Sequence, residues 1–374
     1  MKLIFSSNIA WSIYWFRKGL LKELQQQGFD IYTIAKKDEY AQKLITECFK
    51  FVPIKINNNS KNPLQDLLLI KQYFKVYKQI KPDIILHNAI KPNIYGTIAA
   101  GMLKIPVINN ISGLGTLFIK KSLSTQIAKL LYQLSQKKAT TVFFQNPTDR
   151  DLFVKEKLID KNKTKLLPGS GVDIHKFNPT LNTHQNNKAF EFLFIARLIK
   201  DKGINEYLQA AKILKNKYGD KIKFNILGPF YQANETAITP DELQKWIDEG
   251  IVHYLGETDV VEKEIAHANA VVLPSYREGL SKVLIEASAM AKPIVTTNVP
   301  GCKDVVKDGY NGFLCEPKDE NDLADKMEKM FLLNKDELEK MGNNARKRAV
   351  KIFDEKIVID MYVKEINRIL KNKI

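Results

Sequence analysis

Cysteine and long apolar runs are both scarce in this sequence. Only three cysteines occur in 374 residues, at positions 48, 302 and 315, and none forms a CxxC pair. This spacing argues against a disulfide framework and against a zinc site, so a reducing cytoplasm is the expected environment. No run approaches the roughly 20 apolar residues that a membrane-spanning helix needs. We therefore expect a protein that is neither secreted nor integral to a membrane.

Acidic residues are scarce in the first half of the chain. Residues 1–175 hold 27 Lys and Arg against 12 Asp and Glu, a net charge of +15, whereas residues 176–374 hold 31 against 30, a net charge of +1. A field concentrated on one half favours an anionic partner there, such as nucleic acid, anionic lipid or a phosphorylated substrate. A lysine-rich surface that serves only solubility is the alternative.

The remaining composition is that of a globular protein, with 44% hydrophobic and 27% charged residues. A chain of this length favours two domains of about 150 to 200 residues each. Short apolar runs alternate with amphipathic helical stretches, a pattern typical of parallel sheets covered by helices. The expected strands are 3–6, 30–35, 51–56, 83–87, 107–111, 141–145, 165–168, 191–196, 223–227, 252–255, 270–273, 294–297 and 312–315.

A polar stretch without periodicity, NPTLNTHQNNK, divides these strands into two series. It predicts a linker over 178–188, between a first domain over 1–177 and a second over 189–352. The final helix, 353–374, is expected to cross back onto the first domain. Ligands of doubly wound domains bind at the carboxyl ends of parallel strands, so functional motifs should lie on strand-to-helix loops.

The first motif follows the apolar strand that ends at Ala196. Arg197 and Lys202 stand on the next segment, immediately before Gly203. A guanidinium and an ammonium group can hold a diphosphate between them, and the glycine lets the next helix begin close to that ligand. Without further support, the same residues also fit a solvated turn.

The second motif, PSYREGLSKVLIEA, follows the apolar strand AVVL. Gly279 permits a close backbone approach, and the next helix is expected to begin with free amides whose positive end suits a phosphate; these amides are those of Leu280, Ser281 and Lys282. Glu286 follows Glu278 by about two helical turns, so it can accept hydrogen bonds from the ribose of the same ligand. A solvated helix face is the alternative, because 42 acidic residues make such a pair common by chance.

Both motifs, together with KPIVTTNVPGCKDVV and DGYNGFLCEP, resemble the retaining GT-B glycosyltransferases, especially the bacterial members that assemble capsules, lipopolysaccharides and other glycans. The likeness is specific from about residue 190 onward, and across 1–175 it lies mainly in the pattern of strands and helices. It implies an α/β fold of two Rossmann-like domains facing across a cleft, with the nucleotide sugar held by the second domain.

The resemblance also assigns roles to residues of the second domain. It implies that Arg197 and Lys202 neutralise the donor diphosphate, that Glu278 positions the donor sugar and does not act as a nucleophile, and that Glu286 binds the ribose. The catalytic candidates are Arg197, Lys202 and Glu278. The full set expected at the donor is Arg197, Lys202, Gly228, Tyr254, Leu255, Glu278, Gly279, Leu280, Ser281, Lys282 and Glu286. Tyr254 also fits an ordinary core position at a strand end.

The first domain departs from the family pattern. Many relatives carry a Gly-Gly pair after the first strand, where this chain has Ser6–Ser12, and a histidine where this chain has Asn109–Gly115. The acceptor-side candidates are therefore weak: Asn8, Trp11, His87, Asn110 and Gly113. For His87, a buried structural histidine is the alternative.

Two helical segments, 11–27 and 117–138, combine lysines with apolar side chains. Such a surface can lie on an anionic membrane and admit a lipid-diphosphate acceptor, although the same apolar positions also fit the domain core. They are Trp11, Tyr14, Trp15, Leu117, Phe118, Ile127, Leu130 and Leu131.

The resulting hypothesis is a retaining transferase that moves a hexose or N-acetylhexosamine from a UDP-sugar to a polyprenyl-diphosphate-linked glycan. We expect it in surface-glycan or glycoprotein assembly, on the inner face of the cytoplasmic membrane. No DxD-like acidic pair stands at a strand end, and the family generally works without a metal, so no metal and no cofactor are expected beyond the nucleotide-sugar co-substrate. The alternatives are a nucleotide-sugar epimerase of the same architecture, a basic nucleic-acid-binding protein, and a sugar-binding protein without catalysis. No nucleic-acid module is recognisable.

Overall fold

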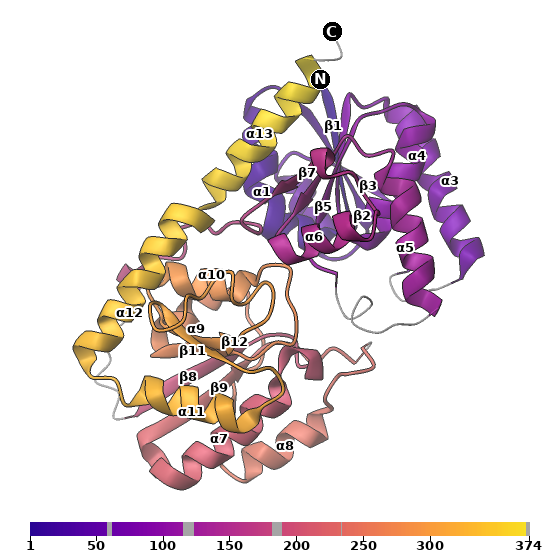
Figure 1. The fold of residues 1–374 in the computed structure, drawn as a ribbon. Coiled ribbons are helices and arrows are strands. Elements are labelled where there is room, and N and C mark those ends of the chain that lie inside the picture. Colours follow the sequence, from indigo (N-terminus) through magenta and orange to yellow (C-terminus); the bar gives the residue numbers. More distant parts are fainter. Residues whose placement is uncertain (58–61, 115–122, 182–188, 233, 372–374) are drawn as a thin grey trace. The chain divides into compact units, whose positions relative to one another are not determined.

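The chain folds into two compact units, each built on one sheet (Figure 1). The computed structural model describes residues 1–57, 62–114, 123–181, 189–232 and 234–371. The first unit comprises Met1–Ser170 and Lys356–Ile374, and the second comprises Gly171–Glu355. Both sheets are entirely parallel. The expected α/β class with two Rossmann-like domains is confirmed.

The first unit holds a seven-stranded sheet in the order β3-β2-β1-β4-β5-β6-β7. Alternate residues of β1 face opposite sides, with Leu3 and Phe5 in one core and Ile4 in the other. Its strands are β1 (Lys2–Ile9), β2 (Asp30–Lys36), β3 (Lys50–Pro53), β4 (Ile84–Asn88), β5 (Val107–Ile111), β6 (Thr141–Phe144) and β7 (Thr164–Leu166).

Helices cover both faces of this sheet. One face packs against α1 (Ala10–Gln26), α2 (Tyr40–Thr46) and α13 (Glu355–Lys371). The other face packs against α3 (Pro63–Ile80), α4 (Thr97–Met102), α5 (Leu123–Gln136) and α6 (Pro147–Lys155). Two short turns of helix, η1 (Pro92–Gly96) and η3 (Lys161–Lys163), complete the unit.

The second unit holds a six-stranded sheet in the order β10-β9-β8-β11-β12-β13. Its strands are β8 (Phe190–Ile195), β9 (Ile222–Leu227), β10 (His253–Tyr254), β11 (Ala270–Leu273), β12 (Ile294–Thr297) and β13 (Gly312–Cys315). Its helices are α7 (Ile204–Tyr218), α8 (Pro240–Asp248), α9 (Val261–His267), α10 (Lys282–Ala289), α11 (Glu320–Phe331) and α12 (Lys335–Arg348), with η4 (Pro179–Leu181), η5 (Lys200–Lys202), η6 (Gly219–Lys221) and η7 (Ala349–Phe353).

The division between the units lies between Ser170 and Gly171, ahead of the 177/178 boundary that the polar composition favours. Backbone hydrogen bonds explain the difference. Val172 N–H donates to Phe353 O at 2.8 Å, and Glu355 N–H donates to Val172 O at 3.0 Å. Arg346 donates to the carbonyl of Phe177 at 2.8 Å. The predicted linker 178–188 therefore begins inside the second unit, and residues 182–188 lie outside the described part of the chain.

Both sheets reverse their strand order beside their first strand. The reversal lies between β1 and β4 in the first unit and between β8 and β11 in the second. Loops that leave neighbouring strands at this point diverge to opposite faces, which opens the ligand-binding position of doubly wound sheets. The two donor motifs follow β8 and β11, so each flanks the reversal point of the second unit.

Candidate active site

The loops after β8 and β11 are locked together. The Tyr276 N–H donates to the Asp201 carbonyl at 2.9 Å, and the Ser275 hydroxyl donates to the same oxygen at 3.2 Å. Gly203, which begins α7, has φ +76°, and a Cβ placed on it would lie 2.1 Å from the Pro274 carbonyl oxygen. Only glycine fits this contact, so the two motifs form one rigid surface.

Lys202 and Glu278 meet across these loops. The Lys202 ammonium donates to Glu278 Oε1, and the two side chains are only 19% and 14% exposed. Restricted access to water strengthens such a pair relative to a surface ion pair. The structure therefore brings together a cation and a carboxylate that lie 76 positions apart in the sequence.

A third loop, after β12, supports Glu278. The Glu278 N–H donates to the Pro300 carbonyl at 3.1 Å, and a Cβ on Gly301 would lie 2.5 Å from the Glu278 carbonyl oxygen. The Ser281 N–H donates to the Gly301 carbonyl at 3.1 Å. The expectation of a free amide at Ser281 is therefore wrong, because the turn into α10 packs on Gly301. Sequence reasoning missed Gly301 as a supporting residue, although a Pro-Gly pair after a strand was the available signal.

Arg197 is exposed, and its guanidinium carbon lies 4.8 Å from the centre of the Tyr231 ring. This cation–π contact holds the guanidinium at the tip of the side chain against Tyr231, which follows β9. Within the described residues, Glu278 makes its ion pair with Lys202 and not with Arg197. Arg197 and Lys202, the two residues predicted to bind the diphosphate, thus share one loop but contact different side chains.

Gly228, Tyr254 and Leu255 gather at the ends of β9 and β10. Gly228 has φ +140°, and its N–H donates to Gly256 O at 2.8 Å. The Tyr254 hydroxyl donates to Gly228 O at 3.0 Å, while burial raises the pKa of Tyr254. Leu255 is 42% exposed. Two backbone turns and an apolar side chain therefore meet beside the end of β8.

Glu286 lies almost buried on α10, where burial raises the pKa of its carboxyl group although Lys282 and Lys176 oppose the shift. The Lys282 ammonium lies 3.8 Å from Glu286 Oε1 and donates to the Gly171 carbonyl at 2.6 Å. Lys176 pairs with Glu262 at 3.3 Å. Sequence reasoning missed Lys176 and Glu262, because they come from other elements and carry no local motif.

In the first unit, the structure overturns the interpretation of His87 as an acceptor-side residue. The ring is 1% exposed. Its Nε2 lies 2.8 Å from the Tyr77 hydroxyl, and its Nδ1 lies 3.0 Å from Asn109 Oδ1 and 3.2 Å from Thr97 Oγ1. A Cβ on Gly96 would lie 2.6 Å from Nε2. Burial lowers the pKa of His87 to about 4, so this is a neutral core histidine enclosed by partners.

The other acceptor-side candidates gather at the carboxyl ends of β1 and β5. Asn8 Oδ1 is buried and accepts no hydrogen bond within the described part of the protein. Asn110 is fully buried, and its carbonyl accepts from Asn93 Nδ2 at 2.8 Å. Trp11 is 39% exposed, and its backbone N–H donates to Asp38 Oδ2 at 2.9 Å. Gly113 has φ +135° just past β5.

The two lysine-rich helical segments differ in what they expose. On α1, Tyr14 and Trp15 pack against the core that also holds Leu3 and Phe5. This helix therefore exposes little apolar surface beyond Trp11. On α5, Leu131 packs inward, but Ile127, Leu130 and Leu134 are about half exposed; their exposed fractions are 51%, 55% and 49%. The alternative, that Tyr14 and Trp15 serve the domain core, is thus favoured for these two residues. Leu117 and Phe118 lie outside the described residues.

Two family descriptions match this chain. Glycosyl transferases group 1 matches residues 181–348, and Glycosyl transferase 4-like matches residues 2–146. The chain belongs to the group 1 glycosyltransferases. This glycosyltransferase carries its locked donor loops inside the first of these two matches.

Curated relatives of the glycosyltransferase match most or all of its length. The N,N'-diacetylbacillosaminyl-diphospho-undecaprenol alpha-1,3-N-acetylgalactosaminyltransferase of Campylobacter jejuni is 29% identical and covers 100% of each chain. The capsular polysaccharide biosynthesis glycosyltransferase CapM of Staphylococcus aureus is 27% identical over 95% of this chain and 94% of its own. The UDP-Gal:alpha-D-GlcNAc-diphosphoundecaprenol alpha-1,3-galactosyltransferase of Escherichia coli is 26% identical over 88% and 87%.

Solved structures share the fold of the glycosyltransferase. A glycosyltransferase from Rickettsia africae superposes with a TM-score of 0.82 at 18% identity and covers 99% of each chain. Anabaena Alr3699/HepE in complex with UDP-glucose gives a TM-score of 0.81 at 18% identity over 100% of each chain. These likenesses establish the GT-B fold of the chain.

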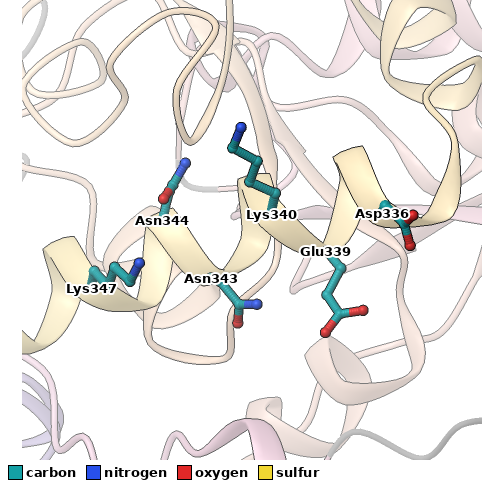
Figure 2. A pocket seen from close by; sticks show the side chains of 6 residues that line it. All are labelled: Asp336, Glu339, Lys340, Asn343, Asn344 and Lys347. Carbon is teal, nitrogen blue, oxygen red and sulfur yellow. The ribbon is translucent and has the colours of Figure 1, made fainter.

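A hollow on α12 carries no comparable chemistry. Figure 2 shows a shallow hollow of about 350 Å³ whose lining side chains all come from α12, namely Asp336, Glu339, Lys340, Asn343, Asn344 and Lys347. They fan out to different sides of that helix, so they enclose no ligand. Among the described residues, no helix is both long and apolar enough to cross a membrane, and no three His, Cys, Asp or Glu side chains cluster as metal ligands would.

Proposed function

We propose that this glycosyltransferase moves a hexose or N-acetylhexosamine from a UDP-sugar to a lipid-diphosphate-linked saccharide, with retention at the anomeric carbon. The observation that carries the proposal is the contact between Lys202 and Glu278 at the reversal point of the second sheet. The C. jejuni and E. coli relatives support the acceptor class, because their names specify diphospho-undecaprenol-linked saccharides.

The chemistry explains why a cation and a carboxylate belong at one point. When the bond between the anomeric carbon and the β-phosphate oxygen breaks, the electron pair leaves with UDP and negative charge grows on the diphosphate. Lys202, with Arg197 on the same loop, lies where it can stabilise that charge. Glu278 can accept hydrogen bonds from sugar hydroxyls and so fix the sugar beside the diphosphate. The acceptor hydroxyl oxygen then forms the new bond to the anomeric carbon, and its proton passes to an oxygen of the departing diphosphate.

We further propose that the two cationic side chains supply the positive charge at the leaving group, so that turnover needs no metal ion. Neither Glu278 nor Glu286 is then required as a metal ligand. Turnover that survives EDTA supports this proposal, and activity that disappears with EDTA and returns with Mg²⁺ or Mn²⁺ contradicts it.

Incubation of the full chain with single UDP-sugars and an undecaprenyl-diphosphate-linked saccharide tests the activity. Mass spectrometry should show the acceptor gaining one hexose or N-acetylhexosamine, and NMR of the product should show the anomeric configuration of the donor. A parallel incubation without acceptor separates the alternative class, because an epimerase changes the donor sugar when no acceptor is present. A donor isomerised there, with no glycosylated acceptor in the full reaction, would overturn the proposal.

We also propose that the protein lies peripherally on the inner face of the cytoplasmic membrane, where such acceptors reside. The exposed apolar residues of α5 and the positive charge of the first half of the chain support this placement. Sedimentation with phosphatidylglycerol-containing vesicles should be strong at low salt and weaken as salt rises. Binding that ignores both salt and lipid charge contradicts it.

A further inference from the structure

A cavity of about 690 Å³ lies in the first unit, apart from the donor loops. It opens past the carboxyl ends of β2 and β3 and is closed by the first turns of α3. Its walls are apolar and basic, and none of its lining residues is acidic: Lys36, Lys37, Pro53, Ile54, Lys55, Ile56, Asn57, Gln65, Leu68, Leu69, Gln72 and Lys91.

The lysines of this cavity differ in their partners. Lys91 pairs with Asp66 at 3.0 Å. Within the described part of the chain, Lys36, Lys37 and Lys55 form no ion pair, and all three are exposed. Other lysines of this unit do find carboxylates, as Lys50 does with Asp30 at 2.7 Å. Like charges around one cavity repel, and an anion with several oxygens relieves that repulsion.

An apolar ridge borders the same cavity. Leu64, Leu67 and Leu68 share one face of the first turns of α3 and are 69%, 62% and 58% exposed. Leu68 also lines the cavity, beside the buried side chains of Ile54 and Ile56. A ligand that placed phosphates among the lysines could therefore lay a hydrocarbon chain along α3, which is the chemistry of a lipid phosphate.

The cavity also adjoins the reversal point of the first sheet. Lys36 is the register partner of Ile9 in the parallel pairing of β1 with β2, next to Asn8. Asn88 ends β4, and its Oδ1, like that of Asn8, is buried without a hydrogen bond in the described residues. The same sheet edge thus holds two buried amide side chains near its reversal point and the lysines of the cavity beyond it.

We propose that this cavity binds the diphosphate of the lipid-linked acceptor, with Lys36, Lys37 and Lys55 on its oxygens and the Leu64–Leu68 ridge on the start of the lipid. The inference rests on the proposed function for the identity of the ligand. Its physical content, a site for a lipid diphosphate, is independent of any transfer reaction.

Binding of farnesyl diphosphate to the full chain, measured by calorimetry below the concentration at which it forms micelles, tests the site directly. The triple variant K36Q/K37Q/K55Q should weaken binding roughly tenfold or more, since each lost contact to a charged group is worth a substantial part of a factor of ten. The matched control is K71Q/K75Q/K78Q, which removes the same charge from exposed positions of α3 outside the cavity. Equal affinity in the two triple variants overturns the proposal.

Further ligands separate the possible sources of phosphate. Wild-type protein should bind farnesyl diphosphate more tightly than inorganic pyrophosphate, and L64S/L68S should reduce that preference. Vesicles of phosphatidylglycerol should bind both lysine triple variants to a similar extent. If the cavity variant alone loses vesicle binding while its affinity for farnesyl diphosphate is unchanged, the cavity recognises a bilayer headgroup and the proposal is wrong.

Kinetics connects the site to turnover. With the lipid-diphosphate-linked acceptor, the cavity variant should raise the acceptor KM about tenfold and leave the UDP-sugar KM unchanged. If the wild-type protein transfers no sugar but binds farnesyl diphosphate through the three lysines, the proposed function fails and this inference stands. If transfer proceeds and the cavity variant has a normal acceptor KM, the inference fails alone.

Discussion

The carboxyl edge of the sheet carries an ion pair in the second unit and neutral amides in the first. Lys202 and Glu278 meet on the loops after β8 and β11, whereas Asn8 and Asn88 lie in the last residues of β1 and β4. The two sheets have the same strand order up to their sixth strand, so topology does not cause the difference. The same framework therefore carries charged side chains at this edge in one unit and neutral amides in the other through side-chain choice alone.

We expect the largest effect on turnover from substitutions of Lys202 and Glu278, the ion pair at the carboxyl edge of the second sheet. Lys202→Met and Glu278→Gln should each lower kcat/KM by roughly 10² to 10³, because each removes an interaction with the reacting part of the donor. The double variant should lose less than the product of the two single losses, since the side chains touch.

Lys200→Met is the matched control for this pair. Lys200 lies on the same η5 turn and is exposed, and its backbone N–H, which the substitution keeps, donates to Thr236 O at 2.7 Å. Its kcat/KM should stay within a few-fold of wild type. Near-normal turnover in both Lys202→Met and Glu278→Gln would remove the charged edge from the mechanism.

The second prediction concerns the neutral network of the first unit. Burial lowers the pKa of His87 to about 4 from an ordinary value of 6.5, so the folded state holds this histidine neutral where the unfolded chain protonates it. His87 therefore contributes stability above pH 6.5 that is lost as pH falls from 6.5 to 4. The shift corresponds to about 3 kcal/mol, and His87→Gln should flatten urea unfolding free energies over that window.

A separate carboxylate of the same unit serves as an internal control. Although burial opposes the shift, hydrogen bonds from Arg368, Lys165 and Thr141 hold the pKa of Glu365 at about 2. A lowered carboxyl pKa stabilises the folded state above the ordinary value and loses that contribution as pH falls toward 2. His87→Gln should keep this second loss. A variant whose unfolding curve still weakens as before between pH 6.5 and 4 would show that His87 is not the group responsible.

The sequence predicted strands better than it predicted side-chain surroundings. The bounds of β11, β12 and β13 agree with the expected strands, because short runs of apolar and β-branched residues mark strands buried on both faces. The strand expected over 51–56 ends at Pro53: the Ile54 N–H makes a last bond to Ala35 O at 3.1 Å, and Ile54 and Ile56 then pack with side chains of α3. The alternation of apolar residues over 51–56 fits a longer strand and a segment that packs against α3 equally well.

For the candidate site, too, the sequence predicted positions on the loops better than it predicted side-chain partners. The motifs predicted that Lys202 and Glu278 serve one ligand, but not that their side chains form an ion pair. No local pattern could show that Tyr77, Thr97 and Asn109 enclose His87, because these partners come from two helices and a neighbouring strand. The amide of Ser281 was misjudged for a related reason, since its acceptor lies on a different loop.

A glycine pair sharpens the comparison within the second unit. Gly203 and Gly250 both have left-handed backbones, with φ of +76° and +69°, but a Cβ on Gly203 meets the Pro274 carbonyl whereas one on Gly250 meets nothing within 4 Å. Each alanine substitution should cost about 1 kcal/mol from the backbone alone. Gly203→Ala should cost about 1 to 3 kcal/mol more and lower kcat/KM roughly tenfold, because the locked loops must separate. Equal effects of the two substitutions on both measurements would show that the loop contact is unimportant.

The smallest effect, and the one with a distinctive sign, concerns Glu286. Burial raises the pKa of its carboxyl group despite the opposing charges of Lys282 and Lys176, so the folded state favours the protonated form. Its contribution to stability is then present at low pH and is lost as pH rises through the raised pKa, opposite in direction to that of His87. We expect Glu286→Gln to match wild type in unfolding free energy near pH 4 and to equal or exceed it at pH 8.

The same substitution should weaken ligand binding, although we expect it to keep or raise the stability of the protein at pH 8. If Glu286 accepts hydrogen bonds from the ribose, Glu286→Gln should weaken UDP binding by roughly fivefold in calorimetry, the value of one modest hydrogen bond. A buried carboxylate that costs stability and supports binding has a functional reason to be there. A variant that is less stable at pH 8 and binds UDP normally would instead identify Glu286 as a structural partner of Lys282. In that case the charge of Glu286 would support the folding of the second unit. Only Lys202 and Glu278 would then distinguish the charged sheet edge of the second unit from the neutral edge of the first.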